Sequence, residues 1–204
     1  VFDRLVDNSS NSLTISNRAD NSIAVTAVTI ADEETVSISG SSAANDLLIT
    51  TLNAGDMTSL TISGAGDVAI ANALTGTRMT TIDSSGATGG TETHATNNVV
   101  AITITGGSGV DEVTGGLLAD TITGNGGADI IIGGAGADTI KGSGGDDVID
   151  GGVGDDVAIF VVKRNIPRLV ANKLTFVLGL IKKRINPLTM FFTFLPFTFI
   201  LLTI

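Results

Sequence analysis

The chain has 204 residues, among them 26 glycines and no cysteine, tryptophan or tyrosine, and its formal net charge is −10. The absence of cysteine excludes disulfides and every thiolate-based metal or nucleophile site. The acidic balance argues against a nucleic-acid binder, which needs clustered Lys and Arg to neutralise phosphates.

Residues 1–105 contain five short segments in which apolar and polar residues alternate. They are LTIS at 13–16, VSIS at 36–39, LTIS at 60–63, TTID at 80–83 and ITIT at 102–105. Alternation with period two predicts strands with one buried face. Their regular spacing suits one coil of a parallel β-helix per segment, with further strands at 47–52 and 67–72. We therefore predict a Thr/Ser/Ala-rich β-solenoid over 1–105 that continues into the later repeats. A β-sandwich of short strands is the alternative.

Two phrases of this region, ALTGTRMTTIDSSGATGG at 73–90 and VAITITGGSGVDEVTGG at 100–116, resemble the Thr/Ala-rich repeats of Gram-negative S-layer proteins. The resemblance implies a calcium-dependent subunit of a two-dimensional surface lattice, exported by type I secretion. Abundant Ser, Thr and Ala with almost no Lys are typical of a structural solenoid at the cell surface.

The sequence shows no catalytic constellation. Its only histidine, His94, lies in the polar stretch THATNN, and we interpret it as a solvated loop residue. No GxSxG elbow, HExxH motif or P-loop is present. The aspartate pairs at 146–147 and 155–156 lie inside calcium-type repeats, so we interpret them as ligands or rim charges rather than as a general acid and base. The sequence therefore predicts no enzyme.

From Gly106 the chain divides into six consecutive nonapeptides: GGSGVDEVT, GGLLADTIT, GNGGADIII, GGAGADTIK, GSGGDDVID and GGVGDDVAI. Because glycine tolerates positive φ, the glycine-rich half of each unit suits a tight turn, and the β-prone remainder suits a short strand. Two repeats then make one coil of a parallel β-roll over 106–159. We expect the aliphatic eighth positions to point inward and stack: Val113, Ile122, Ile131, Ile140, Ile149 and Ala158.

The sixth position of every repeat is aspartate, and these residues line two edges of the expected roll: Asp111, Asp129 and Asp147 on one, Asp120, Asp138 and Asp156 on the other. Carboxylates stacked at a strand spacing of ~4.8 Å repel one another unless a cation lies between them. Nine aspartates and Glu112 against Lys141 leave a net charge of −9 over 106–159. Oxygen ligands without His or Cys select Ca²⁺. Turn carbonyls complete its shell, and the candidates lie around Gly106, Ser108, Gly124, Gly126, Gly133, Ala135, Gly142 and Gly144.

These nonapeptides resemble the GGxGxDxUx repeat of the RTX (repeats-in-toxin) family. The resemblance implies that each aspartate binds Ca²⁺ together with turn carbonyls of its own repeat and of the repeat stacked on it. It also implies that the roll folds on reaching calcium-rich medium after type I secretion. Leu118 replaces a turn glycine, so we expect the site of Asp120 to be distorted or absent. Asn125 and Ser143 are milder departures, and Ala158 suggests that the roll is ending.

Residues 160–204 form a hydrophobic, basic tail without acidic residues. Its final stretch, 185–204, is uncharged and long enough to span a hydrocarbon core of ~30 Å, and a basic triplet precedes it. We consider, in this order, a truncated or frame-shifted reading frame, a membrane anchor and a secretion signal. The sequence opens on Val1 without a basic-then-apolar leader, so we expect either a piece of a longer chain or an export signal elsewhere.

Together these features predict an all-β parallel solenoid with a structural role. We expect a secreted, calcium-binding, S-layer-like subunit of the extracellular cell surface that folds on binding Ca²⁺. The alternative is the C-terminal RTX secretion and folding module of a larger hydrolase, toxin or adhesin. Expected partners are calcium ions and either further copies of the chain in a lattice or a cell-surface polysaccharide. Nucleic acid is not expected, and a membrane only if 185–204 is an anchor.

Overall fold

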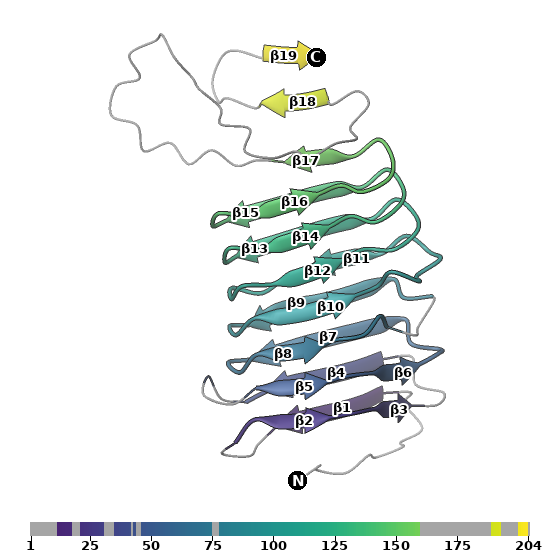
Figure 1. Ribbon diagram of the computed structural model, residues 1–204, viewed down its shortest axis with the longest axis vertical. Coiled ribbons are helices and arrows are strands. Elements are labelled where there is room, and N and C mark those ends of the chain that lie inside the picture. Colours follow the sequence, from purple (N-terminus) through teal and green to yellow (C-terminus); the bar gives the residue numbers. More distant parts are fainter. Residues whose placement is uncertain are drawn as a thin grey trace, which may run out of the picture.

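The computed structural model describes residues 12–17, 21–30, 35–41, 43, 46–74, 78–159, 189–192 and 200–203. Within these ranges all regular structure is β-strand, and most strands stack as the rungs of one elongated solenoid (Figure 1). The prediction of an all-β parallel solenoid is therefore confirmed. No stretch among the described residues forms a helix long and apolar enough to cross a membrane.

The first main sheet contains eight strands, and every neighbouring pair is parallel. In spatial order they are β1 (Ser12–Asn17), β4 (Thr35–Gly40), β7 (Ser59–Gly64), β9 (Thr81–Ala87), β11 (Thr103–Thr105), β13 (Thr121–Gly126), β15 (Thr139–Gly144) and β17 (Val157–Ile159). The five alternating segments of the sequence lie in the first five of these strands. Because a sandwich of hairpins would pair its strands antiparallel, the parallel order excludes the sandwich alternative.

The second main sheet contains seven parallel strands and covers the opposite side of each coil. These strands are β2 (Ile23–Val25), β5 (Leu47–Ile49), β8 (Val68–Ile70), β10 (Thr91–His94), β12 (Glu112–Thr114), β14 (Ile130–Ile132) and β16 (Val148–Asp150). Near the N-terminal end, β3 (Val28–Ile30) and β6 (Leu52–Ala54) pair in parallel as a third side. In the tail, β18 (Thr189–Phe192) and β19 (Ile200–Thr203) pair antiparallel, and the rest of 160–204 lies outside the described residues.

The coils become shorter along the solenoid, as the sequence interval between paired residues shows. In the N-terminal part Thr35 pairs with Ser59. In the nonapeptide part the interval is smaller, and Thr121 pairs with Thr139, the equivalent residue two repeats later. The longest coils are those that carry the third strand. The first two coils are therefore three-sided, and the nonapeptide part is a two-sided roll whose coil is two repeats long, as expected.

One stack of aliphatic side chains runs through the eight-stranded sheet. Its members, paired from strand to strand, are Val36, Leu60, Ile82, Ile104, Ile122, Ile140 and Ala158. All but Ala158 are at most 1% exposed. Leu60, rather than the central Ile62 of its segment, pairs with Ile82, and the register between β7 and β9 shifts beyond Thr61. The expected inward stacking of the nonapeptide aliphatics is confirmed here, and also for Val113, Ile131 and Ile149 of the second sheet.

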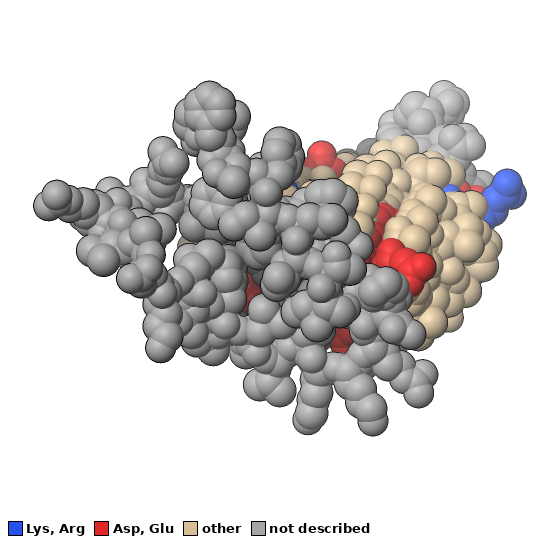
Figure 2. All heavy atoms as spheres, turned by 90° about the horizontal axis from the view of Figure 1, so that it is seen from above, with Lys and Arg blue, Asp and Glu red and all other residues tan. Residues whose placement is uncertain are grey.

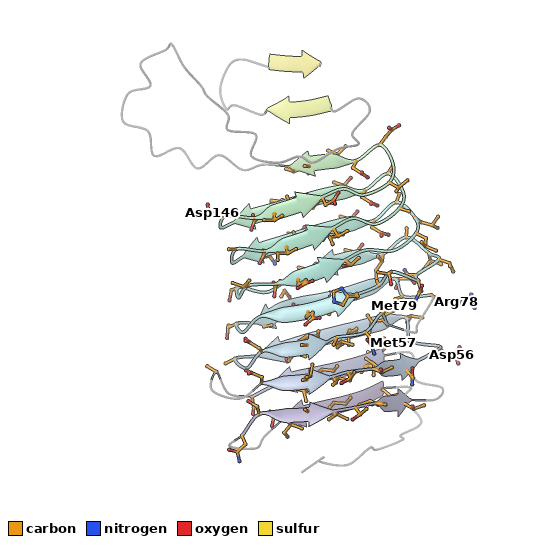
Figure 3. The ribbon with its side chains drawn as sticks, viewed as in Figure 1. Asp56, Met57, Arg78, Met79 and Asp146 are labelled. Carbon is orange, nitrogen blue, oxygen red and sulfur yellow. The ribbon has the colours of Figure 1, made fainter. Side chains whose placement is uncertain are left out.

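At the corners of the coils that lie outside the strands, the core is filled by buried side chains. Met57 and Met79 lie at one corner of neighbouring coils, and both are fully buried (Figure 3). Asn98 is buried beside them: its Oδ1 accepts the Met79 N–H at 2.9 Å, and its Nδ2 donates to the Met79 carbonyl at 2.8 Å. The amide thereby satisfies backbone groups that no neighbouring strand reaches.

Candidate metal centre

Each sixth-position aspartate occupies the same structural place, the residue immediately before a strand. Asp111, Asp129 and Asp147 precede β12, β14 and β16 of the seven-stranded sheet. Asp120, Asp138 and Asp156 precede β13, β15 and β17 of the eight-stranded sheet. The structure therefore brings the six predicted residues into two columns of three, one at each sheet, as the nine-residue period indicates.

One carboxylate oxygen of each aspartate links its coil to the preceding coil of the chain. Oδ1 accepts the backbone N–H of the equivalent residue one coil earlier. The four bonds that join aspartates are Asp111 N to Asp129 at 2.9 Å, Asp129 N to Asp147 at 3.1 Å, Asp120 N to Asp138 at 2.7 Å and Asp138 N to Asp156 at 2.9 Å. At the lower end of the columns, Thr91 N–H and Ile102 N–H donate to Asp111 and Asp120 at 2.8 and 2.9 Å. The Oδ1 atoms are thus engaged in holding the coils together.

The second oxygen, Oδ2, has two different surroundings. In the first two repeats it accepts an N–H from its own turn, from Gly107 to Asp111 at 2.7 Å and from Gly116 to Asp120 at 2.6 Å. Asp129 and Asp138 are both 0% exposed, and their Oδ2 atoms have no hydrogen-bond partner. A buried charged oxygen without a partner is strongly destabilising, so these two atoms indicate a missing cationic ligand.

Backbone conformation divides the turns in the same way. In the third to sixth repeats the second and fourth residues all have positive φ: Asn125, Gly127, Gly134, Gly136, Ser143, Gly145, Gly152 and Gly154. Within 106–123, all of which the structure describes, no residue has positive φ. We call the turns of the first two repeats the lower turns and those of the third to sixth repeats the upper turns. In the lower turns, the residue that donates to Oδ2 is the second one of the repeat. Where that residue is left-handed, at Asn125 and Gly134, its N–H makes no bond to Oδ2.

The opening glycine of each of the first four turns leaves a space into which an aspartate Oδ2 and a carbonyl oxygen of the next coil converge; these glycines are Gly106, Gly115, Gly124 and Gly133. A Cβ built on Gly124 would meet Asp129 Oδ2 and lie 2.8 Å from the Gly142 carbonyl oxygen. A Cβ on Gly133 would likewise overlap Asp138 Oδ2 and the Gly151 carbonyl oxygen. A carboxylate oxygen of one coil and a carbonyl oxygen of the next therefore face the same small volume. This all-oxygen donor set fits Ca²⁺.

Carboxylates alone do not form the site. Nowhere in the described part of the chain do three or more His, Cys, Asp or Glu side chains gather in a group that could hold a metal ion. Backbone carbonyls must therefore supply much of the shell, as at Gly142 and Gly151. The expected carbonyl of Gly106 is engaged otherwise, because the Asn125 side-chain amide donates to it at 2.8 Å. The third-position residues stack turn on turn, with Gly126 and Ala135 N–H donating to the carbonyls of Gly107 and Gly116.

Burial raises the pKa of Asp129 and of Asp138 from 3.8 to about 6, because the charged form loses its hydration. The neighbouring aspartates of each column raise the pKa further, whereas the backbone N–H bonds oppose the shift. Burial also raises the pKa of Asp111 and of Asp120, whose hydrogen bonds again oppose it. A cation placed at Oδ2 would restore the charged form. Seen along the solenoid axis, acidic side chains show on the described surface with few basic ones (Figure 2).

Two further aspartates occupy equivalent places in the N-terminal part and were not singled out from the sequence. Asp46 precedes β5 and Asp67 precedes β8, so they lie in the same sheet as the Asp111 column. Gly90 interrupts this series before β10 and donates its N–H to Asp67 Oδ1 at 2.7 Å. The signal available was an aspartate directly before the strand expected at 47–52 and another as the first residue of the strand expected at 67–72. It lay outside the nine-residue period and was missed.

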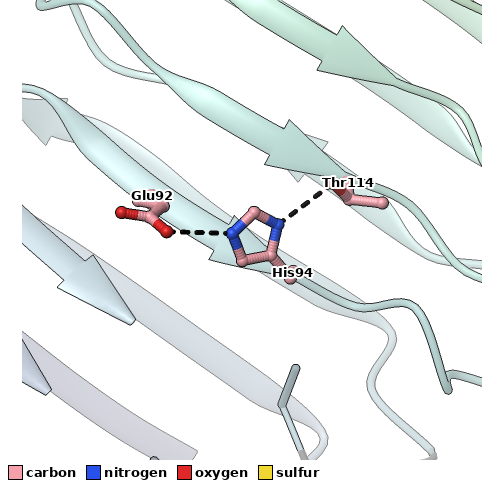
Figure 4. Close-up of polar contacts among 3 residues, drawn as sticks. All are labelled: Glu92, His94 and Thr114. Atoms are coloured by element: carbon pink, nitrogen blue, oxygen red, sulfur yellow. Dashed lines mark hydrogen bonds and ion pairs between the residues drawn. The ribbon is translucent and has the colours of Figure 1, made fainter. Parts of the chain in front are cut away.

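The interpretation of His94 as a solvated loop residue is wrong. His94 ends strand β10, and its side chain is only 18% exposed. Its Nε2 lies 3.1 Å from Glu92 Oε1, and its Nδ1 lies 3.1 Å from Thr114 Oγ1 on the neighbouring strand (Figure 4). The polar sequence THATNN concealed a strand because His94 sits on the outer face, where polar residues are compatible with a sheet.

Comparison with known proteins supports the calcium chemistry of this region. Two stretches, residues 103–122 and 123–158, match the RTX calcium-binding nonapeptide repeat, in 4 copies. The resemblance expected from the sequence is thereby confirmed for this part of the chain, and such repeats are calcium-binding motifs. No curated protein and no solved structure matches the chain significantly.

Proposed function

We propose that the chain is a secreted, calcium-binding structural solenoid whose nonapeptide coils fold when Ca²⁺ binds. The observation that carries this proposal is the pair of buried, partnerless Oδ2 atoms of Asp129 and Asp138 inside repeats of the RTX type. Each faces a carbonyl oxygen of the next coil across a gap that only glycine leaves open. The arrangement lacks one component, a hard divalent cation.

The chain's own residues prepare the site in two ways. The N–H groups of Asp111 and Asp120 donate to the Oδ1 atoms of Asp129 and Asp138, and these bonds hold the two carboxylates in a fixed orientation. The left-handed residues of the turn keep N–H donors away from their Oδ2 atoms. Bound Ca²⁺ supplies the positive charge that offsets carboxylate desolvation and links two successive coils. Without it, repulsion within a segment of net charge −9 opposes folding.

The shape and the chemistry of the chain support a place at the cell surface. The aliphatic stack from Val36 to Ala158 makes one continuous rod, which suits a structural subunit better than an enzyme that must enclose a substrate. Binding of extracellular strength, with Kd on the order of 10⁻⁴–10⁻³ M, would leave the sites empty inside a cell and filled outside. We propose an S-layer-like subunit exported by type I secretion. Its further partners are copies of itself in a lattice or a cell-surface polysaccharide.

Circular dichroism of the full chain tests the calcium step. We expect the β-sheet signal in EDTA to grow on adding millimolar Ca²⁺, and to grow less with the same concentration of Mg²⁺, which prefers octahedral geometry and retains its waters. Identical spectra in EDTA and in Ca²⁺ would contradict the proposal. Electron microscopy of the calcium-loaded protein tests the lattice, for which ordered sheets are the expected result.

A second candidate function is the RTX secretion and folding module of a larger hydrolase, toxin or adhesin. It is favoured by the position of the matched repeats, 103–158, which occupy only the last coils of the described solenoid. The sequence encoded upstream of Val1 discriminates between the two. More Thr/Ala-rich solenoid would support the lattice subunit, whereas a domain with Ser-His-Asp or HExxH residues would support the module.

A further inference from the structure

The two classes of nonapeptide turn do not offer equivalent calcium sites. Calcium in the proposed function bridges two turns that are one coil apart. Four such pairs exist among the six repeats. In two of them both turns are left-handed at the second and fourth positions: 124–129 with 142–147, and 133–138 with 151–156. In the other two, 106–111 with 124–129 and 115–120 with 133–138, the lower turn has no residue with positive φ.

The lower two pairs are already satisfied without a cation. Asp111 Oδ2 is bonded to Gly107 N–H, and Asp111 Oδ1 receives both the N–H and the hydroxyl of Thr91 at 2.8 Å. Asp120 is held in the same way by the N–H groups of Gly116 and Ile102. Each of these carboxylates has the donors that a charged group requires, so a calcium ion there would have to displace them.

Asn125 adds an independent observation at the lower pair of the first column. Its Nδ2 donates to the Gly106 carbonyl oxygen at 2.8 Å, across the space between the two turns. The amide group thus provides the electropositive partner that a calcium ion would otherwise provide to this carbonyl. In the second column, Leu118 stands at the fourth position, where the upper turns require a left-handed glycine.

Stacking explains why the lower turns differ even though 106–111 has all its glycines. Both lower turns rest on turns of the N-terminal part that are not nonapeptides. Ser108 N–H donates to the Ala87 carbonyl at 3.0 Å, and Leu117 N–H donates to the Asn98 carbonyl at 3.0 Å. The next two turns rest instead on nonapeptide turns, because Gly126 N–H and Ala135 N–H donate to the carbonyls of Gly107 and Gly116.

From this we propose, resting on the proposed function, that the chain binds two calcium ions rather than one at every repeat pair. One ion lies between 124–129 and 142–147 at Asp129, and the other lies between 133–138 and 151–156 at Asp138. Asp111 and Asp120 are metal-free structural residues. The coils up to residue 123 therefore fold without calcium and form the surface on which calcium orders 124–159.

The number of calcium ions bound at saturation by the full chain, measured by isothermal titration and by metal analysis after dialysis, tests this proposal. We expect two per chain. Asp129→Asn and Asp138→Asn should each remove one ion, whereas the matched controls Asp111→Asn and Asp120→Asn should retain both.

Four ions, or loss of an ion in a control that still folds, would overturn the inference and leave the proposed function intact. A folded chain without bound calcium would overturn both. The wild-type count decides the question even where a variant fails to fold.

Hydrogen exchange of the full chain in EDTA and in Ca²⁺ gives a second measurement. Backbone amides of 81–123 should be protected to the same degree in both conditions, whereas those of 124–159 should be only weakly protected in EDTA and strongly protected with calcium. Protection of 106–123 that disappears in EDTA together with that of 124–159 would contradict the metal-free role of Asp111 and Asp120.

Discussion

At the scale of single residues, the carboxylates of the roll divide their two oxygens between different tasks. Oδ1 completes a backbone hydrogen bond between coils, and Oδ2 either closes its own turn or remains without a partner. The same residue type, at the same position of the repeat, therefore has both oxygens hydrogen-bonded at Asp111 and one buried oxygen without a partner at Asp129. The difference is set by the backbone of the turn and not by the aspartate itself.

The opening glycine of an upper turn should not tolerate a side chain. A Cβ at Gly133 would occupy the space between Asp138 Oδ2 and the Gly151 carbonyl oxygen. We therefore expect Gly133→Ala to abolish one calcium site and to lower the free energy of unfolding by about 1–3 kcal/mol in Ca²⁺. Gly55→Ala is the matched control, because a Cβ there meets nothing within 4 Å. Equal calcium binding and equal urea midpoints for the two variants would contradict this prediction.

Protons should compete with calcium at Asp129 and Asp138. Their folded pKa of about 6 exceeds the unfolded value of 3.8, so the calcium-free folded state binds more protons than the unfolded chain between these values. The contribution of these two groups to apo stability is therefore most favourable below pH 3.8 and is lost as the pH rises through 6. Calcium binding has the opposite dependence and weakens as the pH falls below 6.

Urea unfolding in EDTA and calcium titration, each at several pH values, check both directions. We expect the apo transition to move to higher urea on acidification from neutral pH, while the calcium affinity falls. An Asp129→Asn/Asp138→Asn double variant is the control, and it should lose most of the pH dependence in EDTA. An apo stability that rises from acid to neutral pH in the wild type would show that these two carboxyls do not dominate.

At the scale of elements, the turns and not the strands separate one part of the solenoid from another. The sequence was sufficient to predict parallel strands, the coil of two repeats and the two columns, because period and alternation report directly on burial. It did not reveal that the turn at 106–111, with every glycine in place, lacks positive φ. That property depends on which turn lies beneath it, a contact between segments that no local pattern encodes. Asp67 and the strand position of His94 were missed for local reasons instead: Asp67 lies outside the nine-residue period, and His94 lies in a polar segment on the outer face of its sheet.

Ser143 lies in a turn whose backbone conformation and buried hydroxyl are unfavourable. It is a non-glycine residue with φ of 81°, and its buried hydroxyl has no hydrogen-bond partner. We expect Ser143→Gly to raise the free energy of unfolding in EDTA by about 1 kcal/mol, because relief of the left-handed strain and of the buried hydroxyl exceeds the added chain entropy.

Ser63→Gly is the control for this change, because Ser63 lies in strand β7 without positive φ. There glycine should lower stability by about 0.5–1 kcal/mol. Thermal or urea unfolding of both variants in EDTA gives the comparison. A loss of stability in Ser143→Gly as large as that in the control would show that the left-handed turn is not strained.

At the scale of the whole molecule, hydrophobic burial decreases and negative charge accumulates from the N-terminal coils to the nonapeptide coils. The N-terminal coils bury large aliphatic side chains on up to three sides, whereas the roll over 106–159 combines a thinner core with a net charge of −9. Calcium thus replaces part of the hydrophobic stabilisation in the narrow coils. The N-terminal coils are thus stabilised by their hydrophobic core, whereas the nonapeptide coils depend in part on calcium ions.

Monovalent salt should partly substitute for calcium by screening this repulsion. The Debye length falls from about 10 Å at 0.1 M to about 3 Å at 1 M salt, shorter than most separations between the columns and rim charges. We expect the melting temperature in EDTA to rise with NaCl, and the rise to be smaller in saturating Ca²⁺. Choline chloride at equal ionic strength controls for specific sodium binding. A melting temperature in EDTA that does not respond to either salt would contradict the electrostatic origin of the instability.

The shortening of the coils, from the Thr35–Ser59 interval to the Thr121–Thr139 interval, changes how far the rod reaches for a given amount of polypeptide. Each coil advances the rod by the same inter-strand step of about 4.8 Å, whatever its circumference. A residue in the narrow coils consequently contributes more height than one in the widest coils.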